Sequence, residues 1–197
     1  MSESFQNKYR IPSARLQNWD YGSNAAYFVT ICTAGREHYF GDVVDGEMVL
    51  SEIGENVKTE WLKTFQMRPD MNLQMNEYVV MPNHFHAIII IGENEFNTKK
   101  WTERGDRRGT ERRDAMHCVS TTNNESKNKF GAQSKNLASI IRGFKIGVTK
   151  NARQINADFA WQSRFHEHII RNDESFQKIS EYIKNNPTNW SSDKFYQ

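Results

Sequence analysis

The sequence has few cysteines and no long apolar run, and each shortage excludes a class of protein. Two cysteines, Cys32 and Cys118, occur in 197 residues. They cannot build a disulfide framework or a cysteine-rich zinc module, and they are typical of a reducing cytoplasm. The longest apolar run, residues 87–91, is far shorter than the roughly 20 residues that span a bilayer. The first residues lack the apolar region of a signal peptide. We therefore expect a cytoplasmic protein without a membrane partner.

The motifs of several common enzyme classes are also absent. No Gly-x-x-x-x-Gly-Lys loop and no Gly-x-Gly-x-x-Gly turn follows a predicted strand, so nucleotide-binding folds lack support. No Gly-x-Ser-x-Gly sequence marks a nucleophile elbow. The 26 lysines and arginines against 24 acidic residues give a formal net charge of +2. Any nucleic-acid surface must therefore come from local clustering of charge.

The most informative pattern is a His-x-His pair in a predicted β-hairpin. Residues 72–81 and 84–91 read as strands rich in β-branched and apolar residues, joined by a Pro-Asn turn. Because successive side chains of a strand point to opposite faces, His84 and His86 share one face and Phe85 lies on the other. Two neighbouring imidazoles could hold a divalent metal ion. A structural pair of buried, neutral histidines is the alternative.

Periodicity predicts further strands and helices around this hairpin. The additional strands are expected at residues 26–33, 47–50 and 164–171. The helices are expected after the N-cap residue Ser51, at residues 135–153 and at residues 174–186, where Pro187 ends the last one. Residues 93–134 are charged and polar, with too few apolar residues to offset the entropy of ordering. We expect a single domain over residues 1–197 that carries this segment as a flexible insertion.

Two basic regions are candidates for nucleic-acid contact. Residues 8–22 form an arm in which Arg10 and Arg15 are interspersed with aromatic residues, a mixture that suits phosphate contacts and base stacking. Every charge in the helix predicted at residues 135–153 is positive, and four of the cations fall in one sector opposite the apolar stripe at about 100° per residue. That sector, which Ile146 interrupts, contains Lys135, Arg142, Lys145 and Arg153. An arm packed on the core and a solvated helix face are the alternatives.

The last predicted helix carries a tyrosine at the edge of its apolar face. Asn186 follows Tyr182 by four residues and so lies beside it along the helix. Two histidines and an amide oxygen would leave positions open on a divalent ion, which could stabilise charge on a phosphodiester. A tyrosine hydroxyl could attack phosphorus, but its pKa near 10 requires help to remove the proton. A packing tyrosine with a solvated hydroxyl is the simpler interpretation of Tyr182.

Taken together, these segments resemble the HUH-type single-tyrosine transposases, and within them the REP-associated tyrosine transposases. The resemblance runs, in chain order, through residues 27–33, 80–86, 140–145, 161–172 and 182–187. Residues 84–86 have the His-hydrophobic-His form of that family. The amide at Asn186, where the insertion-sequence branch typically has glutamine, favours the REP-associated branch, whose members include domesticated enzymes.

The resemblance implies a fold, an activity and a set of site residues. The implied fold is α+β, a ferredoxin-like central antiparallel sheet flanked by helices. His84, His86 and Asn186 would bind Mg²⁺ or Mn²⁺, and Tyr182 would be the nucleophile. Members of the family cut single-stranded DNA at hairpin-forming, palindromic sites, leaving a 5′-phosphotyrosine and a free 3′-OH, and strand transfer reverses the attack. We expect a monomer or a homodimer.

Two other functions are compatible with the same residues. A protein that binds DNA or RNA hairpins with a decayed catalytic site would keep the basic helix and arm but would not cleave. A zinc-dependent hydrolase could use the second His-x-His pair, His166 and His168, although the usual zinc-site spacings with cysteine are absent.

Overall fold

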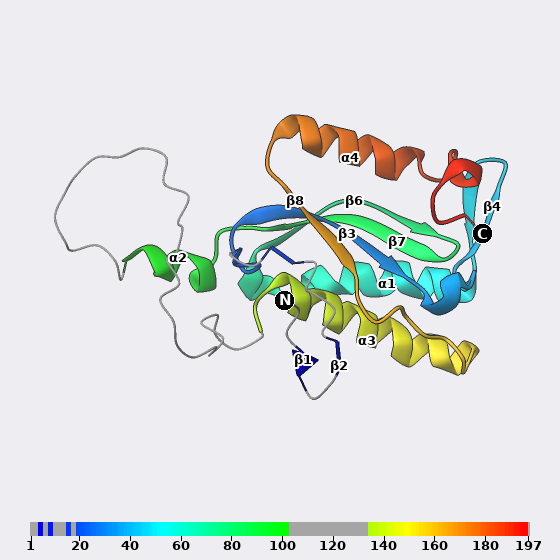
Figure 1. The fold of residues 1–197 in the computed structure, drawn as a ribbon, viewed down its shortest axis with the longest axis horizontal. Coiled ribbons are helices and arrows are strands. Elements are labelled where there is room, and N and C mark those ends of the chain that lie inside the picture. The colour runs from blue at the N-terminus through cyan, green and yellow to red at the C-terminus, as the bar shows by residue number, and fades with distance from the viewer. Residues whose placement is uncertain (1–3, 6–7, 10–14, 17–18, 103–133, 197) are drawn as a thin grey trace.

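A four-stranded antiparallel sheet forms the centre of the molecule in the computed structural model (Figure 1). The structure describes residues 4–5, 8–9, 15–16, 19–102 and 134–196. The sheet has the strand order β6-β7-β3-β8 and consists of β3 (Ala25–Cys32), β6 (Leu73–Met81), β7 (His84–Ile91) and β8 (His166–Ile170). With α1 between β3 and β6 and α3 between β7 and β8, the chain follows the β-α-β-β-α-β order of a ferredoxin-like fold. The predicted α+β architecture is confirmed.

The predicted hairpin and its two faces are confirmed by the register of β6 and β7. Met81 pairs with His84 across the Pro82-Asn83 turn. The Phe85 ring lies 5.0 Å from Trp61 of α1 and 5.3 Å from Phe144 of α3, between ring centroids. The two histidines therefore lie on the other face of the sheet. Alternation along one strand separates an apolar layer from a polar one.

Helices α1 (Glu52–Gln66) and α3 (Leu137–Ile155) cover the Phe85 face of the sheet, below it in Figure 1. The Ser51 side chain accepts a hydrogen bond from the Gly54 amide, and Asn136 with Ser139 forms a capping box, which satisfies amides that a helix start leaves unpaired. The helix predicted at residues 135–153 does not begin at Lys135, as expected, but at Leu137. Lys135 has φ 62°, precedes the cap, and pairs with Asp70.

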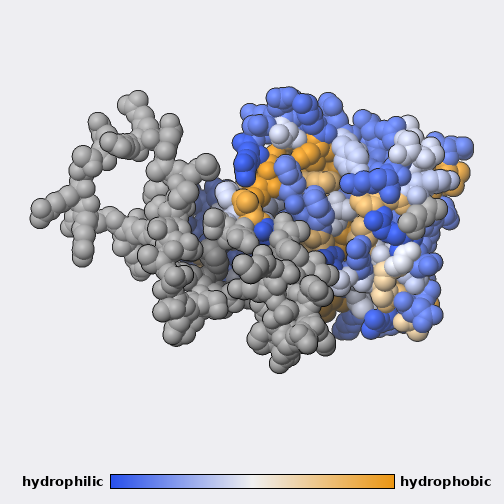
Figure 2. Space-filling model, viewed as in Figure 1, coloured by the Kyte–Doolittle hydropathy of each residue, from blue (hydrophilic) through white to orange (hydrophobic). Residues whose placement is uncertain are grey.

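Helix α4 (Asp173–Asn185) lies on the histidine face, above the sheet in Figure 1. Its N-cap is Asn172, and its apolar side places Ile183 against Ile88 and Ile170. Figure 2 shows that the outward surface of α4 is polar, whereas apolar residues gather beneath it where it covers the sheet. A 3₁₀ turn, Trp190–Ser192, follows and returns the chain toward the histidines.

Several short elements were not predicted. Strand β4 (Gly41–Val44) pairs with β5 (Glu47–Leu50) through Asp45 and Gly46, which both have positive φ as a tight hairpin turn requires. Within the segment expected as a flexible insertion at residues 93–134, helix α2 spans Glu95–Thr102. Most of that segment, residues 103–133, lies outside the described residues, as does Arg10.

The remaining short elements complete the described chain. Near the N-terminus, β1 (Ser4–Phe5) and β2 (Lys8–Tyr9) pair with each other, and 3₁₀ turns occupy Ala34–Arg36 and Pro69–Met71. Within the described ranges, no helix is both long enough and apolar enough to cross a bilayer.

Candidate active site

The hairpin and the last helix bring four of the predicted residues together. His84 and His86 are fully buried, with ring centroids 4.5 Å apart. From α4, the Tyr182 hydroxyl lies 3.2 Å from His86 Nε2. Asn186, one turn further on, is 2% exposed. Residues almost a hundred positions apart in the sequence thus form one cluster between α4 and the sheet.

Hydrogen bonds fix which nitrogen of His84 is available. His84 Nδ1 lies 2.9 Å from the side-chain oxygen of Asn83, which can only accept. Asn83 is held in this orientation because its amide nitrogen donates to the Phe195 carbonyl at 2.9 Å. The proton of His84 is therefore on Nδ1, and Nε2 keeps a free lone pair directed into the site.

The two histidines are neutral because they are buried. Desolvation lowers the pKa of His84 to about 3. Desolvation, followed by the proximity of His84, holds the pKa of His86 well below its usual value. On the far side of the His86 ring, Nδ1 lies 2.8 Å from the Thr30 hydroxyl. Such a contact at the second nitrogen orients an imidazole whose first nitrogen is to act as a ligand.

Two buried acceptors in the cluster have no hydrogen-bond partner among the described residues. They are His84 Nε2 and the side-chain oxygen of Asn186. Leaving such atoms unpaired costs free energy unless a ligand or ion satisfies them. Two imidazole nitrogens and one amide oxygen make a donor set that suits a divalent cation with open positions. In the described part of the chain, no group of three or more histidine, cysteine, aspartate or glutamate side chains is placed to hold a metal ion.

Asp193 contacts the predicted nucleophile and was not predicted. Its Oδ2 accepts hydrogen bonds from the Tyr182 hydroxyl at 3.2 Å and from the Asn186 amide at 3.0 Å. Burial, and then the charge of Asp193, raises the pKa of Tyr182 to about 12. The hydroxyl donates its one proton to Asp193 Oδ2 and also lies 3.2 Å from His86 Nε2. The resting tyrosine is neutral.

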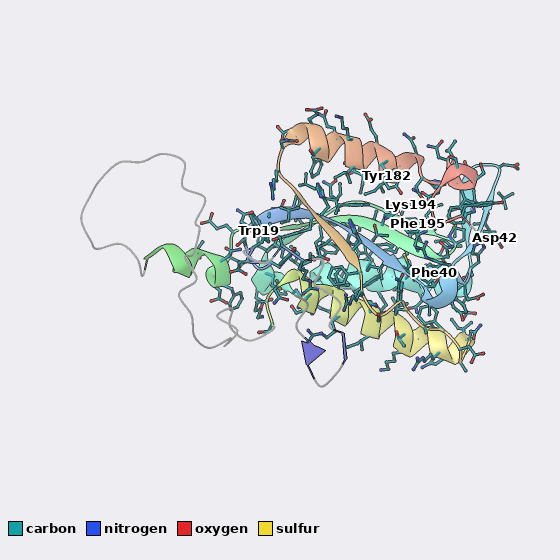
Figure 3. The ribbon with its side chains drawn as sticks, viewed as in Figure 1. Trp19, Phe40, Asp42, Tyr182, Lys194 and Phe195 are labelled. Atoms are coloured by element: carbon teal, nitrogen blue, oxygen red, sulfur yellow. The ribbon has the colours of Figure 1, made fainter. Side chains whose placement is uncertain are left out.

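The C-terminal segment covers the histidines. The Phe195 ring lies 4.5 Å from His84 and 5.7 Å from His86, between centroids, and the Arg36 guanidinium lies 4.4 Å from the centre of the same ring. In Figure 3, Tyr182 points from α4 toward the sheet with Lys194 and Phe195 beside it. A cavity of about 290 Å³ remains, lined by Tyr182, Asn186, Asn189, Ser192, Asp193 and Lys194. The sequence signal for this segment, a few aromatic residues after Pro187, was too weak to identify it.

The other predicted residues lie elsewhere. Arg15, Arg142, Lys145 and Arg153 line one groove on the α3 side of the molecule. His166 and His168 are exposed on the edge strand β8, and the pairing of Thr30 with both His86 and His166 puts His166 on the active-site face. In the described part of the chain they join no group of three metal-ligating side chains, as the zinc alternative would require.

Comparison with known proteins places the chain in a family and a fold. No family model matches the sequence. An uncharacterized protein of Haemophilus influenzae is 33% identical over 190 residues, which cover 93% of this chain and 92% of that protein. A solved structure of a REP-associated tyrosine transposase bound to a REP hairpin is similar over 92% of this chain and 77% of its own, with a TM-score of 0.55 and 19% identity. The chain therefore belongs to the family of the Haemophilus influenzae protein and has the fold of the REP-associated tyrosine transposase.

Proposed function

We propose that the protein is a metal-dependent endonuclease and strand transferase that acts on hairpin-forming single-stranded DNA through Tyr182. The observation that carries the proposal is the cluster itself. A tyrosine hydroxyl lies 3.2 Å from one buried histidine, beside two buried acceptors without a partner in the described chain. The structural relative was solved bound to a REP hairpin, which supports hairpin DNA as the substrate.

His84, His86 and Asn186 are the residues that would hold Mg²⁺ or Mn²⁺. When bound, such an ion would supply Lewis-acid stabilisation of charge on the scissile phosphate. The chain itself provides neutral imidazoles, because burial keeps the pKa of His84 near 3. It also fixes their orientation through Asn83 and Thr30.

Tyr182 would attack phosphorus with its hydroxyl oxygen. The bond from that oxygen to phosphorus forms and the bond from phosphorus to O3′ breaks, which leaves a 5′-phosphotyrosine and a 3′-OH. If His86 uses its Nε2 as a ligand, Asp193 is the carboxylate placed to accept the tyrosine proton, at 3.2 Å. The same carboxyl group can return the proton to the leaving O3′, and the reverse sequence transfers the strand to a new 3′-OH.

The test is a covalent adduct. A hairpin-bearing single strand labelled at its 3′ end, incubated with the protein and Mn²⁺, should give a labelled protein band on a denaturing gel. Tyr182→Phe should give none, because the hydroxyl is the attacking group. Tyr196→Phe is the matched control, since Tyr196 is 53% exposed and outside the cluster. Adduct formed by Tyr182→Phe at the wild-type level would refute the assignment of the nucleophile.

A second candidate is a hairpin-binding protein that does not cleave. The observation in its favour is the covered site, where Phe195 packs on His84 and Asp193 engages the Tyr182 hydroxyl. This function predicts hairpin binding with no adduct at any Mn²⁺ concentration. The same gel, run beside a binding assay, separates the two candidates.

A further inference from the structure

A large basic groove lies on the α3 side of the sheet, away from the histidine cluster. Its volume is about 770 Å³, and it is formed by α3 and residues 160–165, with Arg15 of the arm at one side. We call it the α3 groove. It shares no lining residue with the cavity beside Tyr182. Because Phe144 of α3 packs on Phe85, the sheet lies between the two sites.

The charge of the α3 groove is all of one sign. Arg15, Arg142, Lys145, Lys150 and Arg153 line it, and no aspartate or glutamate does. Two of these cations are held by neutral carbonyl groups: Lys145 donates to Gln162 at 2.7 Å, and the Arg153 side chain donates to Phe159 at 3.1 Å. These bonds fix the side chains and leave the positive charge unneutralised. The chain as a whole has a net charge of only +2, so a groove lined by cations without a carboxylate is a local feature.

Two exposed cations of α3 are available to an anion. The ion pairs found among the described residues include neither Arg142 nor Lys150, although Arg15 does pair with Glu167 at 3.2 Å. Both Arg142 and Lys150 are exposed on the outer side of the helix. A strand of phosphates would gain attraction from both without displacing an internal partner.

The groove is also lined by apolar side chains, which a ligand that offered only phosphate groups would not contact favourably. Ile146, the residue that interrupts the basic sector, is 62% exposed and lies in the groove. Trp161 and Phe165 are half-buried in the same groove, with Lys145 5.8 Å from the Trp161 ring centre and Arg15 5.2 Å from that of Phe165. One exposed isoleucine is ordinary on a protein surface, but one beside two aromatic rings and five cations suits a ligand with both phosphates and flat apolar faces.

We propose that the α3 groove binds an unpaired, single-stranded segment of DNA. Phosphates would contact the cations, and bases would pack on Ile146, Trp161 and Phe165. A duplex presents its phosphates but keeps its bases stacked inside, so it could use the charge and not the apolar side chains. The inference deepens the proposed function, because it assigns the flanking single strand of the hairpin substrate to a second site.

A second, smaller cavity lies along β8 near the start of α4. It has a volume of about 390 Å³ and is lined by Leu16, Glu167 and Asn172, among others. Leu16 follows Arg15, which lines the α3 groove, and Asn172 is the N-cap of α4. A strand leaving the groove would thus pass the β8 edge of the sheet toward the helix that carries Tyr182.

The charge contacts are tested with the single strand dT12 in a fluorescence-anisotropy titration at several salt concentrations. The double variant Arg142→Gln/Lys150→Gln should raise the Kd for dT12 roughly tenfold at low salt. It should also lower the slope of log K against log salt by about 1.4, because each lost phosphate contact on a single strand removes about 0.7. The matched control, Lys58→Gln/Lys178→Gln, removes two exposed lysines that do not line the groove and should leave both values near wild type.

The apolar contacts need a separate variant. Ile146→Ala should weaken dT12 binding roughly threefold, since base contacts are lost, and should leave the salt slope unchanged. It should leave binding of a blunt 12-base-pair duplex unchanged. Met67→Ala, at a position 68% exposed outside the groove, is the control. Binding of duplex as tightly as dT12, effective competition by polyglutamate, or wild-type Kd values in both groove variants would overturn the proposal.

The covalent-adduct assay at saturating hairpin keeps the two proposals apart. If the wild-type protein forms the adduct but the groove variants bind dT12 as tightly as wild type, the proposal for the α3 groove is refuted and the proposed cleavage activity stands. If the wild-type protein forms no adduct but the groove variants lose dT12 binding, the proposed cleavage activity is refuted and the proposal for the α3 groove is supported.

Discussion

At the scale of single residues, the partner of Nδ1 in each histidine fixes the orientation of the ring, and with it the direction in which Nε2 points. Asn83 accepts from His84 Nδ1, and Thr30 contacts His86 Nδ1 at 2.8 Å. Thr30 is 5% exposed, so water cannot easily replace it. The His-x-His pattern predicted that both histidines share one face of the sheet, but it could not predict the contact with Thr30, because Thr30 comes from a strand more than fifty residues earlier.

Thr30→Val tests the orienting role. The substitution keeps the shape of the side chain and removes the hydroxyl, so the His86 ring loses its fixed orientation. We expect Mn²⁺ affinity to fall by roughly 10-fold or more, measured by isothermal titration calorimetry. The control is Thr64→Val, which removes another buried hydroxyl, one that donates within α1 to the Glu60 carbonyl at 2.9 Å. An equal loss of affinity in both variants would mean that the effect reflects general destabilisation.

The sequence pattern predicted one part of the candidate site, Tyr182 and Asn186, and missed another, the segment that follows α4. The four-residue spacing predicted that they are neighbours on one helix, and the structure brings them to the histidines. Asp193 and Phe195 could not be foreseen, because their place depends on the chain turning back after the helix. Four backbone hydrogen bonds hold that turn, from Asn189, Trp190, Ser192 and Asp193 to residues three or four positions earlier.

At the scale of elements, a bulge in β6 helps to anchor α4. The pairing of β6 with β7 shifts register between Met75 and Tyr78, and Glu77 lies within this irregularity. Its carboxylate lies 2.8 Å from the Lys184 ammonium and accepts from the Ser180 hydroxyl at 3.3 Å, both on α4. The hydrogen bond from Lys184 lowers the pKa of Glu77 below its ordinary value of 4.5.

Glu77→Gln should therefore destabilise the protein only where Glu77 is ionised. A carboxylate whose pKa is lowered on folding stabilises the fold above its unfolded pKa and loses that effect as pH falls through the folded pKa. We expect a loss of about 0.5 kcal/mol in the free energy of unfolding at pH 7, typical of a partly exposed pair. The difference from wild type should vanish at pH values below the lowered pKa, in urea denaturation. Glu174→Gln, which breaks the more exposed pair with Lys178, should have a smaller effect; a difference for Glu77→Gln that persists at low pH would contradict the role of the ion pair.

The elements that sequence periodicity predicted are those whose pattern is set locally. Helix α1 followed from Ser51 and the spacing of its apolar residues, and β7 from a continuous apolar run. Strand β4 was missed because four residues carry too little pattern, although Asp45-Gly46 is a typical hairpin turn. Helix α2 was missed because its residues are mostly polar, and composition alone does not exclude a helix.

At the scale of the whole molecule, the candidate metal donors come from two layers, the sheet and α4, which also pack through Ile88, Ile170 and Ile183. Two donors lie on β7 of the sheet and the third on the C-cap of α4. Helices α1 and α3, in contrast, pack on the opposite face through Trp61, Phe85 and Phe144. An ion held by His84, His86 and Asn186 would therefore tie α4 to the sheet and leave the α1 and α3 layer unchanged.

Mn²⁺ should then stabilise the molecule unevenly. Binding to the folded state alone adds about 2.7 kcal/mol at a concentration 100 times the Kd. Hydrogen exchange of the α4 amides should slow on addition of Mn²⁺, because their local opening breaks the Asn186 contact, whereas sub-global exchange in α1 should change less. Chelation with EDTA should reverse the change, and His84→Ala should abolish it. Equal protection of α1 and α4, or protection that survives in His84→Ala, would show that the ion binds elsewhere. Protection confined to α4 and β7 would place it between the layers, where Tyr182 can reach a phosphate.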